Sequence, residues 1–536
     1  MKAIYKSLIA AVALMPTLTS CIEEVFPTNG MTQEQLEASE NAAGAYFFGM
    51  AAYMNHYATL SSSYHYDWGY GSLMHIRDVM TGDMAVVSSG YDWYSNWELD
   101  QYQGETYVYG QFIWNLYSQL VLTTNNTIGV INPETASDLH LGYLGVALAF
   151  RANHYLDLAR MYEFLPNDKT SNINNDGNNV EGLTVPILTD ETTEQEARNN
   201  PRVTHQEMFE FIQSDLQKAE QYISKASFEK TQPSLAVVYG LFARLYMWNE
   251  NYQLAAEYAR KAINQHGPTK VTTREQWLDK ITGFNSLNTP SWMWGVQSIR
   301  EDDVVQSGIL NWTSWMSNET TYGYATAGPL TQISASMYDR MSNDDFRKLS
   351  FVAPAGSALD GQNPFIDPDW AAENLIPYAN IKFRPNQGNM EDYTVGSASA
   401  YPLMRIEEMY FIEAEATAHI SAAQGAQLIN DFMRTYRYSS YTCNASSTDD
   451  VVEEIVFQKR VELWGEGQTF FDIKRLNYSV TRNYPGSNFY PTCAFNTNGR
   501  PAWMNTVFVQ TEQNNNEALR GWNNPDPSDL YEGAGL

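Results

Sequence analysis

The sequence predicts a mainly α-helical fold, in which tetratricopeptide-like helix pairs form a scaffold and long loop-rich, partly β segments are inserted between them. Three observations predict it. Apolar residues recur at helical spacing in three separate stretches. The stretch from Ala243 to Ala259 has the small-residue pattern of a tetratricopeptide repeat. Between these stretches the chain is rich in Gly, Ser, Asn, Asp and Pro, which is typical of loops.

The first element along the chain is a targeting signal. Two lysines precede a short apolar run at 8–15, which is too short to span a bilayer. The following Leu18-Thr19-Ser20-Cys21 resembles the lipobox of a bacterial lipoprotein, in which Cys21 is lipidated and becomes the new N-terminus. We therefore expect a signal peptide at 1–20, a lipidated tether at 21–40 and a lipid anchor in the outer membrane. Acidic residues at 23 and 24 resemble surface-export signals of Bacteroidetes lipoproteins and favour the cell surface.

The helices follow in order. Phe112, Leu116 and Leu120 share one face, and the run from Ala147 to Met161 repeats this spacing, so the two stretches are expected to pack as a pair. Thr204 and Glu207 stand three residues apart, as in a capping box that begins a helix. Further helices are expected over 235–248, over 252–263 before Gly267-Pro268, and in a last block that begins at Pro402 and continues through 426–436 and 451–464.

Three segments are expected to be irregular, at 61–111, 269–401 and 478–536. Within them, Trp292, Trp294 and Val296 alternate and predict a strand packed into the scaffold. The alternation of aromatic residues at 64, 66, 68 and 70 also has period two and could form one buried strand face. Loops on a rigid scaffold often carry binding residues, so these segments are the place to look for a site.

Composition excludes several classes of partner. The formal net charge of −29 would repel nucleic acid and polyanionic glycans. The chain has neither a C-x-x-C nor an H-E-x-x-H motif, and no zinc site or other cofactor is expected. The run from Asn172 to Gly177 partly matches a calcium loop but lacks the first carboxylate and the glutamate at position twelve, so we interpret it as a polar turn. Cys443 and Cys493 could pair in an exported protein, although their spacing does not require it.

Four blocks of sequence resemble the SusD/RagB family of nutrient-binding lipoproteins, the surface partners of TonB-dependent outer-membrane transporters. The blocks are Trp114 with Tyr117 and Asn126; Phe150 to Tyr162 followed by Val185-Pro186; Ala236 to Tyr246; and Pro402 to Ala416 followed by Arg460-x-Glu462 and Glu466 to Arg475. Two features depart from the family pattern: Thr469 stands where a basic residue is common, and a long polar insert occupies 167–182.

The resemblance implies a SusD-like organisation. An N-terminal part at 41–270 would carry tetratricopeptide-like helices and ligand loops, and a C-terminal RagB/SusD-like part at 271–536 would carry a loop-rich insert and the final helix pairs. The resemblance also implies that the helical lobe docks on a SusC-like TonB-dependent barrel, for which the protein acts as a lid that delivers oligosaccharide.

Aromatic residues make up 13% of the chain and predict a sugar-binding surface. A sugar ring has an apolar face that an exposed aromatic ring can cover and a polar rim that amides and carboxylates can bind. Trp93, Tyr94 and Trp97, interleaved with polar residues, cannot all face one core, and the family carries ligand-stacking aromatics on a loop here. The predicted ligand-binding residues are Asp67, Trp68, Tyr91, Asp92, Trp93, Tyr94, Asn96 and Trp97, with Trp312, Trp315 and Tyr322 as a second wall.

Catalysis is the rival hypothesis. Glu462 and Glu466 are spaced so that a helix would place both carboxylates on one face, as an acid and base pair requires. We instead expect a structural ion network, with Arg460, Lys474 and Arg475 as counter-ions and a similar pairing of Arg405 with Glu408. No G-x-S-x-G motif is present. The expected function is glycan capture without catalysis; the alternatives are oligopeptide capture for a RagA-like transporter and a glycan-degrading enzyme.

Overall fold

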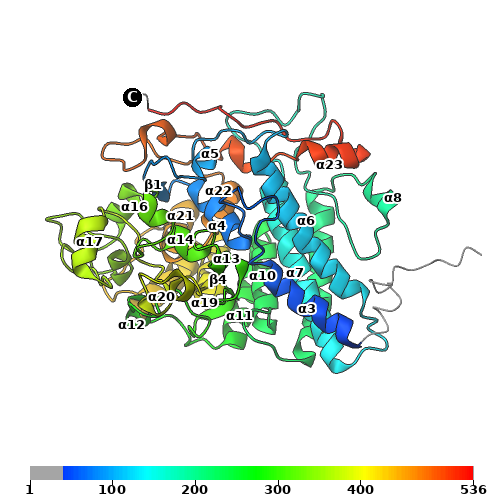
Figure 1. The fold of residues 1–536 in the computed structure, drawn as a ribbon, viewed down its shortest axis with the longest axis horizontal. Coiled ribbons are helices and arrows are strands. Elements are labelled where there is room, and N and C mark those ends of the chain that lie inside the picture. The colour runs from blue at the N-terminus through cyan, green and yellow to red at the C-terminus, as the bar shows by residue number, and fades with distance from the viewer. Residues whose placement is uncertain (1–39, 535–536) are drawn as a thin grey trace, which may run out of the picture.

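The computed structural model describes residues 40–534 and has the mainly helical architecture that the sequence predicts (Figure 1). The predicted signal peptide, the lipidation site at Cys21 and the tether up to residue 39 lie outside the described residues. Within 40–534, no helix is both long enough and apolar enough to cross a membrane.

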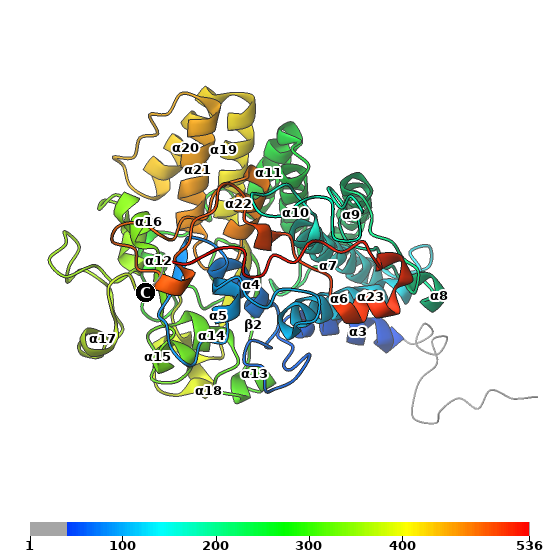
Figure 2. The ribbon, with the colours of Figure 1, turned by 90° about the horizontal axis from the view of Figure 1, so that it is seen from above.

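Nine long helices of the described chain form the scaffold. They are α3 (Glu40–Tyr53), α6 (Val108–Gly129), α7 (Asp138–Tyr162), α9 (His205–Tyr222), α10 (Leu235–Trp248), α11 (Tyr252–His266), α19 (Ile406–Ile420), α20 (Ala422–Tyr436) and α21 (Thr448–Glu462). Each contacts the next in this order, except that α21 packs chiefly on α19. Seen from above, the row runs from α3 and α6 through α9 and α10 to α20 (Figure 2). Most helices predicted by apolar spacing are therefore confirmed.

The ends of two scaffold helices follow from the predicted capping residues. The Thr204 hydroxyl accepts the backbone N–H of Glu207, whose carboxylate in turn accepts the backbone N–H of Thr204 at 2.8 Å, so the capping box that begins α9 is confirmed. Gly267 follows α11 with φ of +119°, a conformation that suits glycine.

The predicted strand at Trp292 is confirmed, and its partner corrects another prediction. Strand β2 (Trp292–Gln297) pairs antiparallel with β4 (Ala400–Arg405), with Gly295 opposite Pro402. The last helical block therefore begins at Ile406, not at Pro402. Proline is tolerated there because a two-stranded sheet has only edge strands, where a missing N–H can face away from the partner. A second small sheet pairs β1 (Met84–Val86) with β3 (Thr331–Ile333).

The segments predicted to be irregular contain many short helices. These are α4 (Tyr70–Val79), α5 (Ser95–Glu98), α12 (Arg274–Trp277), α13 (Asp303–Gln306), α14 (Trp312–Met316), α15 (Tyr324–Ala327), α16 (Ala335–Arg340), α17 (Pro368–Asn374), α18 (Tyr393–Gly396) and α23 (Gln510–Asn515). Two further short helices, α8 (Glu194–Ala197) and α22 (Thr469–Leu476), lie outside those segments. Residues 64–69 form turns before α4, so the alternative of a buried strand there is wrong.

The C-terminal segment runs back across the N-terminal half, as the red trace along the top of Figure 1 shows. The Asn524 amide donates to the carbonyl of Tyr162 at 2.8 Å, and the Tyr531 hydroxyl donates to Asp168 at 2.7 Å. One large hydrophobic core contains residues from Ala43 to Tyr531 and so crosses residue 270, where the sequence-based division into two parts was placed.

Candidate functional site

Most of the aromatic residues predicted to face solvent are in fact buried. Trp97 is 2% exposed and Tyr94 0%, and the indole N–H of Trp68 donates to the Tyr94 hydroxyl at 2.8 Å. These rings therefore form a core under the loop at 87–109 and cannot stack on a ligand. Burial contradicts the predicted ligand-binding role of six residues, namely Asp67, Trp68, Tyr94, Trp97, Trp312 and Trp315.

Asp67 shapes a loop in place of binding ligand. Its carboxylate accepts the backbone N–H groups of Thr59, Leu60 and Ser61 at 2.9, 2.5 and 3.2 Å. Burial raises the pKa of Asp67, and these three donors oppose that rise. The loop from 58 to 67 is thereby folded around one buried side chain.

The predicted second wall, on α14, is also internal. Trp312 stacks on Tyr401 with ring centroids 4.7 Å apart, and Trp315 stacks on Tyr324 at 4.2 Å. Tyr322 is half-exposed, but it makes an edge contact with Tyr393 at 6.3 Å, on α18. It therefore does not join the other predicted residues.

Four predicted residues remain accessible around α5. Tyr91 is 62% exposed, and Asp92, Trp93 and Asn96 are half-exposed. Trp93 stacks on His65 with centroids 4.5 Å apart and planes 25° apart, and His65 also contacts the hydroxyl of Tyr324. The Trp93 ring is thus held by a partner behind it while part of it faces water.

The structure adds three half-exposed rings that sequence reasoning did not assign to the site, namely Tyr64, His65 and Tyr109. The Asn96 amide donates to the Tyr109 hydroxyl, and Tyr109 packs at 5.6 Å from the buried Tyr66, which also stacks on Tyr64. The period-two alternation of aromatic residues singled out Tyr64 but did not predict that its ring faces outward. No sequence pattern marked His65 or Tyr109. We call Tyr64, His65, Tyr91, Trp93, Asn96 and Tyr109 the aromatic shelf.

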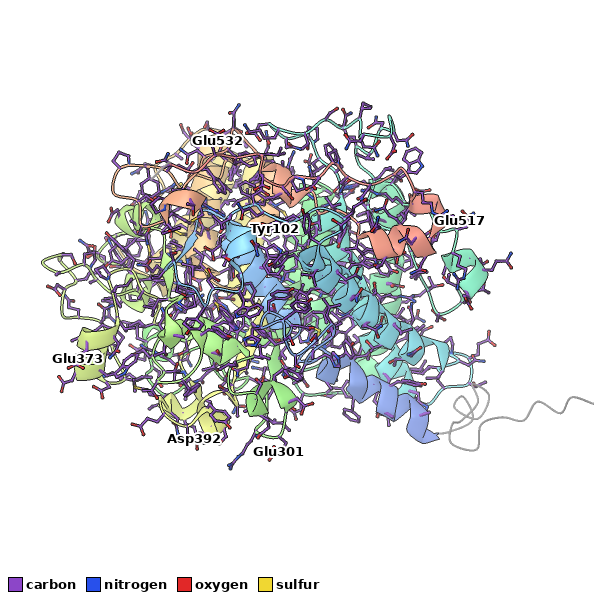
Figure 3. The ribbon with its side chains drawn as sticks, turned by 45° about the horizontal axis from the view of Figure 1, so that its top comes forward. Tyr102, Glu301, Glu373, Asp392, Glu517 and Glu532 are labelled. Carbon is purple, nitrogen blue, oxygen red and sulfur yellow. The ribbon has the colours of Figure 1, made fainter. Side chains whose placement is uncertain are left out.

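The shelf has an extension at Tyr102 and Tyr107, which are 45% and 40% exposed with centroids 5.1 Å apart. Tyr102 has a φ of +55°, which is uncommon for a side chain of its size. The C-terminal segment holds this conformation, because Gln103 donates its backbone N–H to Ser528 and Asp529 donates to the carbonyl of Asp100. Tyr102 lies near the middle of the view in Figure 3.

The electrostatics of the shelf suit a ligand whose polar groups are uncharged, such as sugar hydroxyls. Burial lowers the pKa of His65, so its ring is neutral at pH 7, and burial raises the pKa of Asp92. Asp92 and Asn96 lie in the same segment as Trp93; the Asp92 carboxylate accepts the backbone N–H of Tyr94 at 2.9 Å, and the Asn96 amide donates to the Tyr109 hydroxyl. Ring faces flanked by such groups can cover the apolar side of a sugar and hydrogen-bond its hydroxyls.

The predicted ion network around Glu462 and Glu466 is confirmed, but its counter-ions differ. Glu462 binds Arg437 at 2.6 Å, Arg347 at 2.9 Å and Arg405 at 3.2 Å. Glu466 binds Arg405 at 2.9 Å and Lys382 at 2.7 Å. Burial alone would raise the pKa of Glu462, yet the three guanidinium groups hold it well below its usual range.

The predicted counter-ions have other partners. Arg460 binds Asp83, and Arg475 binds Asp472 at 2.8 Å. Lys474 donates to the backbone carbonyls of Met161 and Glu163 at 2.9 and 2.7 Å. Glu408 binds Arg244 at 2.7 Å, so its predicted pairing with Arg405 is wrong. Asp472 is only three residues from Arg475, but spacing along the chain could not identify the other partners because they come from distant segments.

Two further sequence features have structural roles. The Asn174 carbonyl oxygen accepts the backbone N–H groups of Asp176 and Asn178, and its amide donates to the carbonyl of Gly521, so the calcium-like run is a polar turn docked on the C-terminal segment. No cluster of three or more His, Cys, Asp or Glu side chains within 40–534 could hold a metal ion. Cys443 and Cys493 are both buried and unpaired with each other.

Comparisons with known proteins agree with the family resemblance. A family model described as "Starch-binding associating with outer membrane" matches residues 36–247, and a second, described as "SusD family", matches 364–529. SusD-like protein P2 of Formosa agariphila is 22% identical over 283 residues, which span 50% of this chain and only 56% of that relative.

Two solved structures share the fold. A SusD-like carbohydrate binding protein from Bacteroides vulgatus aligns with a TM-score of 0.69 at 21% identity, covering 89% of this chain and 96% of its own. A laminarin binding SusD-like protein aligns with a TM-score of 0.55 at 16% identity, covering 82% and 91%. At these identities the likeness establishes the architecture.

Proposed function

This chain belongs to the SusD/RagB family, and from that premise we propose that it is a cell-surface protein that captures oligosaccharide on the aromatic shelf. The half-exposed Trp93, stacked on His65 in a segment that also carries the half-exposed Asp92 and Asn96, is the observation that carries the proposal. The starch-binding description of the matched family model, and the carbohydrate and laminarin ligands named for two structural relatives, support a glycan as the ligand.

The expected affinity is modest. If three rings of the shelf each contribute about 1–2 kcal/mol through apolar area removed from water, the dissociation constant lies between about millimolar and tens of micromolar after the cost of ordering. Such weak binding suits a protein that hands its ligand onward.

The proposal includes the cellular setting. A lipid anchor at Cys21 would hold the protein at the outer membrane, with which the matched family is described as associating, and a SusC-like TonB-dependent transporter would receive the glycan. Co-purification of such a barrel with the full-length chain from membranes, lost when Cys21 is replaced by alanine, is the expected result. Recovery of the unaltered chain and the Cys21→Ala variant in equal amounts from the soluble fraction would contradict the lipid anchor.

We also propose that the bound glycan is not cleaved. The two glutamates spaced like an acid and base pair are buried and neutralised by four cationic side chains, which leaves neither free for proton transfer. Incubation with a polysaccharide panel should give retention without released sugar. Release of sugar would contradict this point, and retention of basic oligopeptides but no glycan would favour the peptide-capture alternative.

Replacement of Trp93 tests the site. Trp93→Ala should abolish or strongly reduce retardation of the protein in gels that contain the bound polysaccharide, because it removes the central ring. Trp370→Ala is the matched control: it is also a half-exposed tryptophan, but it lies on α17, far from α5 in both Figure 1 and Figure 2. Equal retardation of both variants would exclude the shelf as the binding surface.

A further inference from the structure

A cavity of about 460 Å³ lies between α3 and β2, and none of the shelf residues lines it. Helix α3 and the loop after it contribute Phe48 and Tyr57, the segment before α10 contributes Gln232, and the turn after β2 contributes Ile299, Asp302 and Asp303. We call this cavity the α3–β2 pocket. Its volume is in the range of sites that hold small ligands.

The pocket exposes apolar surface that folding leaves uncovered. Phe48 is 64% exposed and Ile299 is 52% exposed, and both line the cavity. Single exposed apolar side chains are ordinary, but two large ones bordering the same cavity provide a face for the apolar side of a ligand.

The pocket also contains an unsatisfied polar group. Gln232 is 5% exposed, lines the cavity, and its side-chain carbonyl oxygen has no hydrogen-bond partner within the described chain. Leaving a buried acceptor unpaired costs about 1–3 kcal/mol. A ligand that donates a hydrogen bond to this oxygen, after a rotation of the Gln232 side chain that opens it to the cavity, would remove that cost.

The charge of the pocket is negative. Asp302 and Asp303 stand at its rim, and none of its lining residues is a lysine or an arginine. Burial lowers the pKa of His56, the remaining titratable base of the lining, so that ring is neutral at pH 7. Burial raises the pKa of Asp302, and the neighbouring carboxylates of Asp303 and Glu301 raise it further; their negative charge is what a bound cation would offset.

We propose that the α3–β2 pocket is a second ligand site that accepts one amino-sugar unit, with the ring against Phe48 and Ile299 and the ammonium group facing Asp302 and Asp303. The preference for an ammonium group rests on the pocket alone, whereas the choice of a sugar rests on the proposed function. A lysine side chain is a thin stem that would leave most of a cavity of about 460 Å³ unfilled, so a ring is the better fit.

Binding of single sugars to the full-length protein tests the proposal. In saturation-transfer NMR and calorimetry, D-glucosamine should bind, D-glucose should bind about fivefold more weakly because it lacks the charge, and D-glucuronate should not bind. Equal binding of the three sugars would overturn the proposal, as would tighter binding of lysine amide than of glucosamine.

Variants separate this pocket from the shelf. Asp303→Asn should weaken glucosamine binding about fivefold, while Glu373→Gln, the matched control on an exposed carboxylate of α17 that does not line the pocket and is labelled in Figure 3, should leave it unchanged. Gln232→Met should weaken binding without lowering the melting temperature, because it removes an unpaired buried acceptor. A lower melting temperature with unchanged binding would contradict this role for Gln232.

The two sites can fail independently. Trp93→Ala should leave glucosamine binding intact. Polysaccharide retention that depends on Trp93, without glucosamine binding, would refute the pocket alone. Glucosamine binding that depends on Asp303, without polysaccharide retention, would refute the proposed function of the shelf and leave the pocket in place.

Discussion

Trp93 and Trp97 lie four residues apart, yet only Trp93 presents part of its ring to solvent. Trp97 is 2% exposed and makes edge contacts with Tyr66 and Tyr109 at 5.1 and 5.0 Å. We expect Trp97→Ala to lower the free energy of unfolding by about 3–5 kcal/mol because it leaves a large cavity. Denaturant unfolding should show this loss for Trp97→Ala and a much smaller one for Trp93→Ala; equal losses would mean that the two rings have the same structural role.

At the level of single residues, the sequence drew attention to the loop but did not distinguish its outward-facing rings from its buried ones. Aromatic density and interleaved polar residues drew attention to 91–97, where Tyr91, Trp93 and Asn96 reach the surface. Whether a given ring is covered depends on partners far away in the chain, such as Tyr401 for Trp312. Those partners leave no local pattern, and the same holds for His65, which is placed by its contact with Trp93.

At the level of elements, close helix packing depends on a glycine of α20. A Cβ added at Gly425 would lie 2.4 Å from the Cβ of Ala418 and 2.6 Å from its Cα, on α19. Gly425→Ala should therefore force the two helices apart and destabilise the protein by about 1–3 kcal/mol in thermal or denaturant unfolding.

Gly49 on α3 is the matched control for Gly425. An added Cβ there would meet no atom within 4 Å, so Gly49→Ala should gain about 0.5–1 kcal/mol from the higher helix propensity of alanine. If both substitutions stabilise the protein, α19 and α20 are not in the close contact inferred here.

The helices were predictable because their signals are local, whereas β4 was not. Spacing and caps are contained within a few residues, as Thr204 and Glu207 illustrate. The segment from Pro402 to Arg405 is a strand only because β2, more than a hundred positions earlier, supplies its hydrogen-bond partners. Apolar residues in so short a stretch fit a helix or a strand equally well.

At the level of the whole molecule, buried carboxyl groups fall into two classes with opposite effects on stability. Although burial opposes it, Arg77 and Arg160 lower the pKa of Asp157 to about 2, and Lys459 and Arg475 lower that of Asp472 to about 2. Burial raises the pKa well above the usual value for Asp78, Glu98 and Asp100. The first class stabilises the fold while ionised, and the second destabilises it while ionised.

The stability of the protein should therefore pass through a maximum in mildly acidic solution. As pH falls from 7 toward about 4, Asp78, Glu98 and Asp100 hold protons in the folded state that the unfolded chain does not yet bind, so stability rises, and relief of the −29 net charge acts in the same direction. Burial lowers the pKa of His75 to about 3 and that of His154 to about 4, so these two imidazoles oppose the rise; we expect the three acids and the net charge to outweigh them.

Below about pH 4 the sign reverses. Asp157 and Asp472 then bind protons in the unfolded chain but stay ionised in the folded state. Each group lowers the free energy of unfolding by about 2 kcal/mol by pH 2. Melting temperatures measured from pH 7 to pH 2 should rise, peak between about pH 4 and 5 and then fall. A steady decline from pH 7 would mean that Asp78, Glu98 and Asp100 are solvated and have ordinary pKa values in the folded state, and that the ion-paired carboxylates and the buried histidines determine the acid response.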